Sequence, residues 1–191
     1  MGRSIIPNGG NDLIFTPPEL AQQIVDYFDP FGQTPLDLTS GEIMNIQVME
    51  PCKGQGAFVD ALLNNARKYN YDNTVSWCEL TEGVDFLATE LPANMHYNHY
   101  HWIVTNPPWS KFREFLKKSM QISDNVVFLS LVNAFFFKAR FRDIKEHGFG
   151  FKEIVFIETP PKPWPQFGIQ LGVVHLQKGY RGDTQFTHGF P

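Results

Sequence analysis

The sequence predicts an α/β domain built on a mostly parallel β-sheet, with helices on both faces. Short apolar runs typical of buried strands alternate along the chain with segments of helical length and periodicity. A glycine-containing turn joins the first of these strands to a helix. The last two strands have no helix between them, which indicates an antiparallel C-terminal hairpin at one edge of the sheet.

The predicted elements follow one another in a regular order. Residues 1–18, rich in Gly, Asn and Pro, are expected to form an irregular arm. A helix is expected over 18–28, with Pro17 fitting its start and Thr16 as its cap. After a loop at 29–45, we expect strands at 46–49, 74–78, 100–105, 125–132, 152–157 and 172–176, and helices at 56–69, 111–121 and 134–146. The whole chain, residues 1–191, is expected to form one domain that ends in a tail at 179–191.

The composition is that of a globular protein with a sizeable core: 191 residues, of which 42% are hydrophobic and 19% charged. A net charge of −4 excludes a polybasic protein, so any contact with nucleic acid must be local. No apolar run approaches the roughly 20 residues that cross a membrane, and the first ten residues lack the apolar core of a signal peptide. The two cysteines, Cys52 and Cys78, suggest neither a disulfide framework nor a zinc site, which favours a reducing, cytoplasmic compartment.

A glycine turn follows the first strand, in the segment Glu50-Pro51-Cys52-Lys53-Gly54-Gln55-Gly56-Ala57-Phe58. Gly54 and Gly56 let the backbone pass close to a ligand, and the N–H groups that open the next helix point toward it. The Lys-Ser/Thr of a Walker motif is missing, which disfavours phosphate cradling. Glu50 would repel a pyrophosphate but can accept hydrogen bonds from an amine. The turn therefore favours a ligand with both ammonium and carboxylate groups, the alternative being an ordinary tight turn.

Acidic residues follow the second strand. Ligands of open parallel sheets lie outside the carboxyl ends of the strands, so Glu79 is placed to accept hydrogen bonds from a ribose diol. The alternative for Glu79 is a solvated loop acid. Asp85 could accept a hydrogen bond from an adenine amino group, with Phe86 packed nearby, or could instead be the N-cap of a short helix.

The apolar run 102–105 ends in Asn106-Pro107-Pro108-Trp109. The Asn106 side chain and the Pro107 backbone each offer a carbonyl oxygen, and Pro108 has no N–H. Two acceptors can hold both hydrogens of an aromatic amino group, which frees its lone pair to attack an electrophilic methyl group. Trp109 can stack on the ring that bears the amine, worth roughly 1–3 kcal/mol. Most of the rate gain would come from orientation and from acceptors aimed at developing charge. The alternative is that Pro-Pro only ends a strand.

At these residues the chain resembles the amino-methyltransferases that use S-adenosylmethionine, and most closely their DNA adenine-N6 branch. The resemblance rests on Phe15-Thr16-Pro17-Pro18-Glu19-Leu20-Ala21, residues 50–58, Glu79, Asp85-Phe86 and residues 106–109. In order, these are similar to the motif at the methionine end of the cofactor, the Asp/Glu-Pro-x-x-Gly-x-Gly-x-Phe loop, the ribose acid, the adenine-contacting Asp-Phe and the catalytic Asn/Asp-Pro-Pro-Tyr/Phe/Trp. Their order is that of the gamma arrangement, and the compact layout is similar to small phage-encoded enzymes.

The resemblance implies a Rossmann-like class I methyltransferase fold that binds S-adenosylmethionine and methylates the N6 amino group of adenine in DNA, in the cytoplasm of a host if the source is viral. The implied cofactor-binding residues are Phe15, Thr16, Glu50, Pro51, Cys52, Gly54, Gly56, Phe58, Glu79, Leu80, Asp85, Phe86 and Asn106. The implied catalytic residues are Asn106, Pro107, Pro108 and Trp109. The short step from Glu79 to Asp85 indicates that the usual third strand and its helix are reduced or missing before His101. No separate target-recognition domain is visible, so sequence specificity is minimal or comes from loops such as 159–168.

Contacts with the substrate are expected near residues 106–109. Trp109, Lys111, Arg113 and Phe167 are the predicted substrate-binding residues. Lys117 and Lys118, and beyond the buried strand Lys138, Arg140 and Arg142, could also contact phosphates or form a solvated helix face. Phe135-Phe136-Phe137 could meet DNA or a partner, although burial is the more common fate of such a run. Trp164 and Phe167 are candidates for the second face of a base-stacking pocket, and no metal site is predicted at His96, His99 and His101.

Other functions remain open at this point. The same chemistry could act on RNA adenine or on the N4 of cytosine, although Asn106 disfavours cytosine because many cytosine-N4 enzymes carry Ser there. A protein-glutamine methyltransferase fits Trp109 and the Glu50 loop less well. A catalytically silent nucleic-acid-binding or partner subunit is disfavoured because the loop and the corner at 106–109 are both intact.

Overall fold

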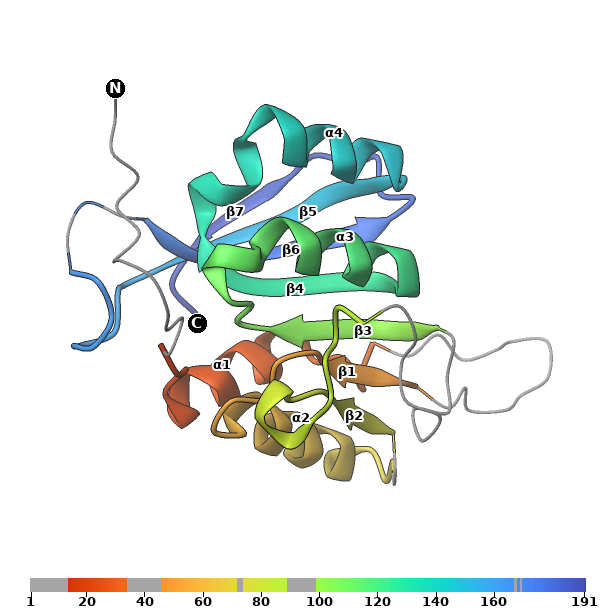
Figure 1. Ribbon diagram of the computed structural model, residues 1–191, viewed down its shortest axis with the longest axis vertical. Helices are drawn as coiled ribbons and strands as arrows, with labels where there is room; N and C mark the ends of the chain where they lie inside the picture. Colours follow the sequence, from red (N-terminus) through yellow and green to blue (C-terminus); the bar gives the residue numbers. More distant parts are fainter. Residues whose placement is uncertain (1–13, 34–45, 72–73, 89–98, 167, 169) are drawn as a thin grey trace.

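The computed structural model describes residues 14–33, 46–71, 74–88, 99–166, 168 and 170–191. Within these ranges the chain forms four α-helices and seven β-strands (Figure 1). They are α1 (Pro18–Phe28), β1 (Val48–Glu50), α2 (Ala57–Lys68), β2 (Val75–Trp77), β3 (Tyr100–Thr105), α3 (Phe112–Ile122), β4 (Ser123–Leu131), α4 (Lys138–Glu146), β5 (Phe149–Ile157), β6 (Leu171–Lys178) and β7 (Gln185–His188). Short 3-10 turns lie at Leu80–Glu82, Trp109–Lys111 and Val132–Phe136.

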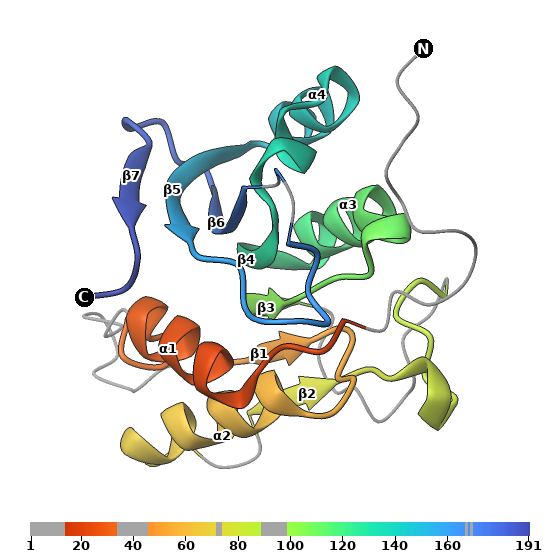
Figure 2. The ribbon, with the colours of Figure 1, turned by 90° about the vertical axis from the view of Figure 1, so that its left-hand side faces the viewer.

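The described strands form a single sheet in the order β2-β1-β3-β4-β6-β5-β7. The pairs between β2, β1, β3 and β4 are parallel, whereas β6 is antiparallel to both β4 and β5. Helices α1 and α2 lie on one face and α3 and α4 on the other (Figure 2). The predicted fold class, a mostly parallel sheet with an antiparallel C-terminal hairpin, is therefore confirmed. The topology brings the carboxyl ends of β1 to β4 to one edge of the sheet, here called the carboxyl edge.

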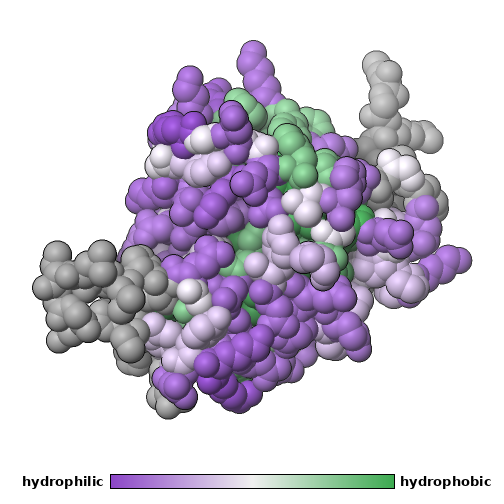
Figure 3. Space-filling view, turned by 180° about the vertical axis from the view of Figure 1, so that it is seen from behind, coloured by the Kyte–Doolittle hydropathy of each residue, from purple (hydrophilic) through white to green (hydrophobic). Residues whose placement is uncertain are grey.

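Each pair of helices buries its apolar stripe against the sheet. In α1, a proline opens the helix and Ala21, Ile24, Val25 and Phe28 are buried. In α3, residues such as Phe112, Leu116 and Met120 do the same on the other face. At roughly 1.5–3 kcal/mol for each large apolar side chain, this burial is the main force holding the helices to the sheet. The surface of α1 and α2 that faces away from the sheet is largely hydrophilic (Figure 3). Hydrophobic surface gathers toward the end of the molecule that carries β5 and β7.

The predicted cap of the first helix is wrong. The N-cap position is Pro17, and no side chain caps the helix there. The Thr16 hydroxyl instead accepts a hydrogen bond from the Asn106 side chain, 3.3 Å away. The Thr16 oxygen, which the local sequence predicted as the helix cap, is therefore hydrogen-bonded to a residue far along the chain instead.

The helix predicted over 134–146 begins only at Lys138. The residues before it, Val132–Phe136, form a 3-10 turn in which Phe135 is buried edge-on against Phe112, with ring centroids 4.8 Å apart. Phe136 and Phe137 remain exposed. The tight turn places Phe135 in the core directly after β4, and an α-helix starting at 134 would not be compatible with the extended backbone at Phe137.

The predicted C-terminal tail contains a strand that sequence analysis missed. β7 pairs in parallel with β5 and extends the sheet. Its Thr187 hydroxyl donates to Glu153 Oε1 at 2.8 Å, and the Tyr27 hydroxyl of α1 donates to the same oxygen. Phe190 then packs against Tyr27. Residues 179–191 are thus part of the fold and tie β5 to α1.

At the other end of the sheet, β2 is the outermost of the described strands, with partly exposed side chains. The predicted reduction of the third strand stays a prediction, because residues 89–98, where part of that strand would fall, lie outside the described residues. Among the residues that are described, no helix is both long and apolar enough to cross a membrane.

Candidate active site at the carboxyl edge

The glycine turn is fastened to the end of β2 by a set of hydrogen bonds. The Lys53 amide donates to the Cys78 carbonyl at 2.9 Å, and the Gly54 amide donates to Glu79 Oε2 at 2.8 Å. Gly54 has a φ of 54° and Gly56 a φ of 91°, both in the left-handed region that favours glycine. A Cβ on Gly54 would also lie 3.1 Å from the Phe15 ring. The backbone is therefore tightly held and approaches Phe15 closely, and Pro51 and Phe58 of the same segment are buried.

Glu50 ends β1 and is 1% exposed. Its Oε1 accepts a hydrogen bond from the Cys52 amide at 2.9 Å and another from the Thr105 hydroxyl at the end of β3. Burial raises the pKa of Glu50 to about 8, although these two hydrogen bonds favour the ionised form. Glu50 thus joins the glycine turn to β3, a role that sequence analysis did not anticipate. Thr105 was missed too, and its position at the end of a buried strand was the only signal.

This buried carboxyl has a consequence for stability. In the unfolded chain Glu50 loses its proton near the ordinary pKa of 4.5, whereas the folded protein retains it up to about pH 8. Its contribution to the free energy of unfolding therefore falls as the pH rises from about 4.5 to about 8, by about 1.4 kcal/mol for each unit of pKa difference.

The variant Glu50→Gln is expected to remove this pH dependence. Denaturant unfolding at pH 5, 7 and 9 should show wild type losing several kcal/mol relative to Glu50→Gln as the pH rises. The exposed Glu82→Gln serves as the control, and its profile should match wild type. Parallel profiles for wild type and Glu50→Gln would contradict a buried carboxyl of raised pKa.

Glu79 follows β2 after one intervening residue, Cys78, and both of its oxygens accept hydrogen bonds. Oε2 accepts from the Gly54 amide, and Oε1 accepts from the Thr81 amide and hydroxyl at 3.0 and 2.8 Å. Partial burial raises its pKa, but the Thr81 and Gly54 amides and the Lys53 charge outweigh this, so the net pKa is lowered. Glu79 is therefore an ionised acceptor at the carboxyl edge. The neighbouring Leu80 is 71% exposed and offers an apolar surface beside it.

Asp85 and Phe86 have different environments. Asp85 is exposed, and its Oδ1 accepts a hydrogen bond from the Leu87 amide at 2.8 Å in a turn rather than at the start of a helix. Phe86 is buried against Phe115, with ring centroids 5.1 Å apart. Phe86 therefore supports the segment from within the core, and Asp85 is the member of the pair that is open to a ligand.

Asn106 has one end of its amide held and the other end free. Its Nδ2 donates to the Ile14 carbonyl at 3.1 Å and to the Thr16 hydroxyl at 3.3 Å. Its Oδ1 is buried and has no hydrogen-bond partner among the described residues. These contacts fix which end of the amide is the acceptor. Ile14, whose backbone makes one of them, was missed because a carbonyl leaves no signal in the sequence.

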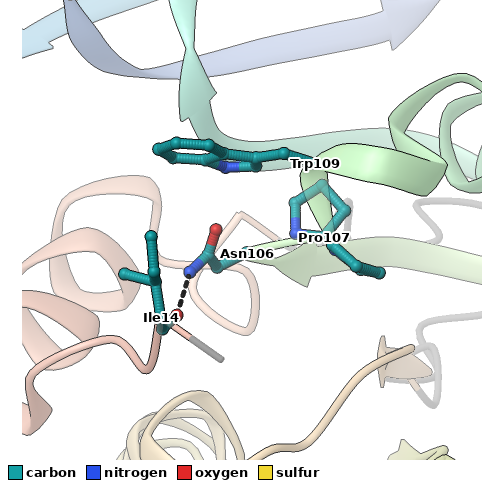
Figure 4. Close-up of a pocket in the computed structure, with 5 residues that line it drawn as sticks. Ile14, Asn106, Pro107 and Trp109 are labelled. Atoms are coloured by element: carbon teal, nitrogen blue, oxygen red, sulfur yellow. Dashed lines mark hydrogen bonds between the residues drawn. The ribbon is translucent and has the colours of Figure 1, made fainter. Parts of the chain in front are cut away.

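The free Oδ1 faces a small pocket. This pocket is lined by Ile14, Asn106, Pro107, Pro108 and Trp109. Figure 4 shows the Asn106 oxygen pointing toward the Trp109 ring, with the hydrogen bond to Ile14 on the opposite side. The Cys52 thiol donates to the backbone carbonyl of Asn106 at 3.2 Å and so joins the glycine turn to the pocket. The structure therefore brings the predicted loop and the predicted corner together.

Trp164 does not form the second face of a stacking pocket. It is 2% exposed and meets Trp109 edge-on, with ring centroids 6.2 Å apart. Its Nε1 donates to the Phe15 carbonyl at 3.3 Å. The Pro-rich loop thus supports Trp109 and fastens the N-terminal segment that holds Asn106. Phe167, the other residue predicted there, lies outside the described residues.

The predicted basic contacts are of two kinds. Lys111 is exposed. Arg113 instead forms a bidentate ion pair with Asp143 of α4, with Nε 2.6 Å from Oδ2 and Nη2 3.0 Å from Oδ1. The pairing gives Arg113 a structural role between α3 and α4. The part of the chain that the structure describes holds no cluster of three or more metal-ligating side chains. His99 instead pairs with Asp124.

Comparison with known proteins adds the fold family. No protein-family model and no curated protein matches the sequence. Among solved structures, a Listeria monocytogenes protein assigned to the class I S-adenosylmethionine-dependent methyltransferases is similar, with a TM-score of 0.69 and 11% identity over 96% of this chain and 68% of that one.

Two subunits of type I restriction enzymes are also similar. The EcoKI M protein has a TM-score of 0.62 and 14% identity over 89% of this chain, and a modification subunit from Vibrio vulnificus has a TM-score of 0.60 and 15% identity over 91%. The chain spans less than half of each, 45% and 46%. The fold of this protein is therefore the Rossmann-like fold of the class I methyltransferases.

Proposed function

We propose that the protein transfers a methyl group from S-adenosylmethionine to the N6 amino group of adenine in DNA. The observation that carries the proposal is the held amide of Asn106, whose Oδ1 is buried and lacks a partner among the described residues while Nδ2 has two acceptors. A buried acceptor without a donor costs about 1–3 kcal/mol. An amino group entering the pocket would supply that donor.

The chemistry follows from this geometry. Asn106 Oδ1 and the Pro107 carbonyl would accept the two hydrogens of the amino group, and Trp109 would stack on the adenine ring. When bound, the cofactor would supply an electrophilic methyl group. The amino nitrogen would take this methyl group, the cofactor would leave as S-adenosylhomocysteine, and the nitrogen would then release one proton to water. Because positive charge would develop on nitrogen, the Asn106 oxygen, held in place by the hydrogen bonds of its amide, would stabilise it without reorganising.

The residues of the glycine turn fit the cofactor. Glu79 carries the negative charge and free lone pairs that suit ribose hydroxyls, and its position between Gly54 and Thr81 is fixed by hydrogen bonds. Asp85 would accept from the adenine amino group of the cofactor, beside the exposed Leu80. Phe15, whose ring approaches Gly54, and Thr16, which contacts Asn106, would lie at the methionine end. The remaining residues of the turn, Pro51, Cys52, Gly56 and Phe58, would shape the backbone that contacts the cofactor.

DNA is proposed as the substrate because Asn106–Trp109 resembles the motif of the adenine-N6 enzymes and because two structures of similar fold are subunits of restriction enzymes. Adenine must leave a duplex to reach the pocket, at a cost of a few kcal/mol. A single strand would avoid that cost.

A methyl-transfer assay with tritiated S-adenosylmethionine tests the function. Purified protein is incubated separately with single- and double-stranded DNA, RNA and a protein mixture, and labelled nucleosides are identified by mass spectrometry. We expect label in N6-methyladenine from DNA. Label mainly in RNA, in cytosine or in protein would replace the proposed substrate. Cofactor binding without transfer to any of them would point to a silent subunit.

A further inference from the structure

The basic residues beyond β3 and β4 differ in whether an acid neutralises them. Arg113 is paired with Asp143, and Arg142 lies 3.8 Å from Glu146 on its own helix. Arg140 makes no hydrogen bond or ion pair within the described ranges, and its Nε is buried without a partner. A buried N–H donor without an acceptor is costly, and within the described ranges Arg140 is the basic residue with such a donor.

Two aromatic rings hold the guanidinium of Arg140 in place. Its central carbon lies 4.9 Å from the centroid of Phe137 and 5.7 Å from that of Phe112. Such contacts attract the cation but use none of the in-plane N–H donors. A planar group already held against two rings loses little further entropy when it binds, and its donors match the oxygens of a phosphate.

The position of this group relates it to the candidate active site. Phe112 begins α3 three residues after Trp109, and Arg140 lies in the first turn of α4. Both helices begin at the carboxyl edge, just beyond the ends of the neighbouring strands β3 and β4 (Figure 1). Lys111 is exposed and directly precedes α3. Lys138 is also exposed and is the first residue of α4. Phe137 is 56% exposed beside them.

We propose that Arg140 binds a backbone phosphate of the DNA strand whose adenine enters the pocket, with Lys111 and Lys138 at neighbouring phosphates. The proposal rests on the proposed function, since it assigns this surface to the same substrate. The partly exposed Phe137 ring adds a surface on which an unpaired flanking base can stack. A strand that follows the starts of α3 and α4 would pass directly beside Trp109.

Fluorescence anisotropy with a labelled single-stranded, adenine-containing DNA oligonucleotide tests this surface between 50 and 200 mM salt. Arg140→Met keeps the aliphatic contact with the rings but removes the charge. We expect it to weaken binding about five- to tenfold at low salt and to reduce the slope of log K against log salt by about 0.7, the value for one phosphate of a single strand. Arg142→Met, on the same helix, is the matched control and should change affinity less than about twofold.

The outcomes separate this surface from the proposed function. Equal effects of Arg140→Met and Arg142→Met, or an unchanged salt slope, would overturn the surface, as would a wild type that binds no DNA. If Arg140→Met unfolds, Arg140→Lys should keep the salt slope of wild type, whereas Lys138→Met should reduce it. An Arg140-dependent slope without any methyl transfer would leave the surface standing and remove the function. Methyl transfer to DNA together with a salt slope that Arg140→Met does not change would support the proposed function and remove the proposed surface.

Discussion

Asn106→Ala is expected to reduce methyl transfer by about 10²–10³-fold, while S-adenosylhomocysteine still binds. The first effect follows because the variant removes an acceptor aimed at the charge that develops on nitrogen, and such groups are worth about 10²–10³ in rate. The second follows because, within the described ranges, the glycine turn contacts Asn106 through the Cys52 thiol and the Asn106 backbone carbonyl, not through the Asn106 side chain. Tritium transfer and calorimetry measure the two quantities.

Two further variants make the test specific. Asn106→Asp keeps an acceptor but removes the Nδ2 donor that contacts Ile14 and Thr16, so it should retain part of the activity. Asn64→Ala changes an exposed asparagine on α2 and should behave as wild type. Activity near the wild-type level in Asn106→Ala would remove Asn106 from the catalytic role.

Glu79→Ala is expected to weaken binding of S-adenosylhomocysteine about 10- to 100-fold. The carboxylate holds the Gly54 amide and the Thr81 turn, and in the proposed function it also accepts from the ribose. Hydrogen bonds to charged groups contribute about 1.5–3 kcal/mol each, which corresponds to this loss. Calorimetry of the wild type and the variant gives the ratio directly.

Glu82→Ala is the matched control for this prediction. Glu82 belongs to the same turn, carries the same charge and pairs with Lys53 at 2.5 Å, but it makes no contact with the Gly54 amide. It should bind the cofactor product within about twofold of wild type. If Glu79→Ala bound as tightly as wild type, Glu79 would have no part in a ribose site.

Elements with a local signal were predicted closely. The helix at Pro18–Phe28 and the strand at Tyr100–Thr105 have the predicted bounds. A proline starts the former, and Asn106-Pro107 ends the latter. By contrast, β7 has only four residues, mostly exposed, and gains its stability from pairing with β5. A strand of this kind has little periodicity of its own, so its existence depends on a partner some 30 residues away.

The sequence by itself determined the order of the strand ends and the chemical groups that follow them: an acid and a glycine turn after β1, an acid after β2, and an amide with two prolines after β3. These are local patterns, and parallel pairing then places them at one edge. Only the tertiary structure decided which way the Asn106 amide faces, because Ile14 and Thr16 lie about 90 residues away. It also decided that Trp164 is buried, that Arg113 is neutralised and that Arg140 is not, since each depends on partners brought together by packing rather than by sequence.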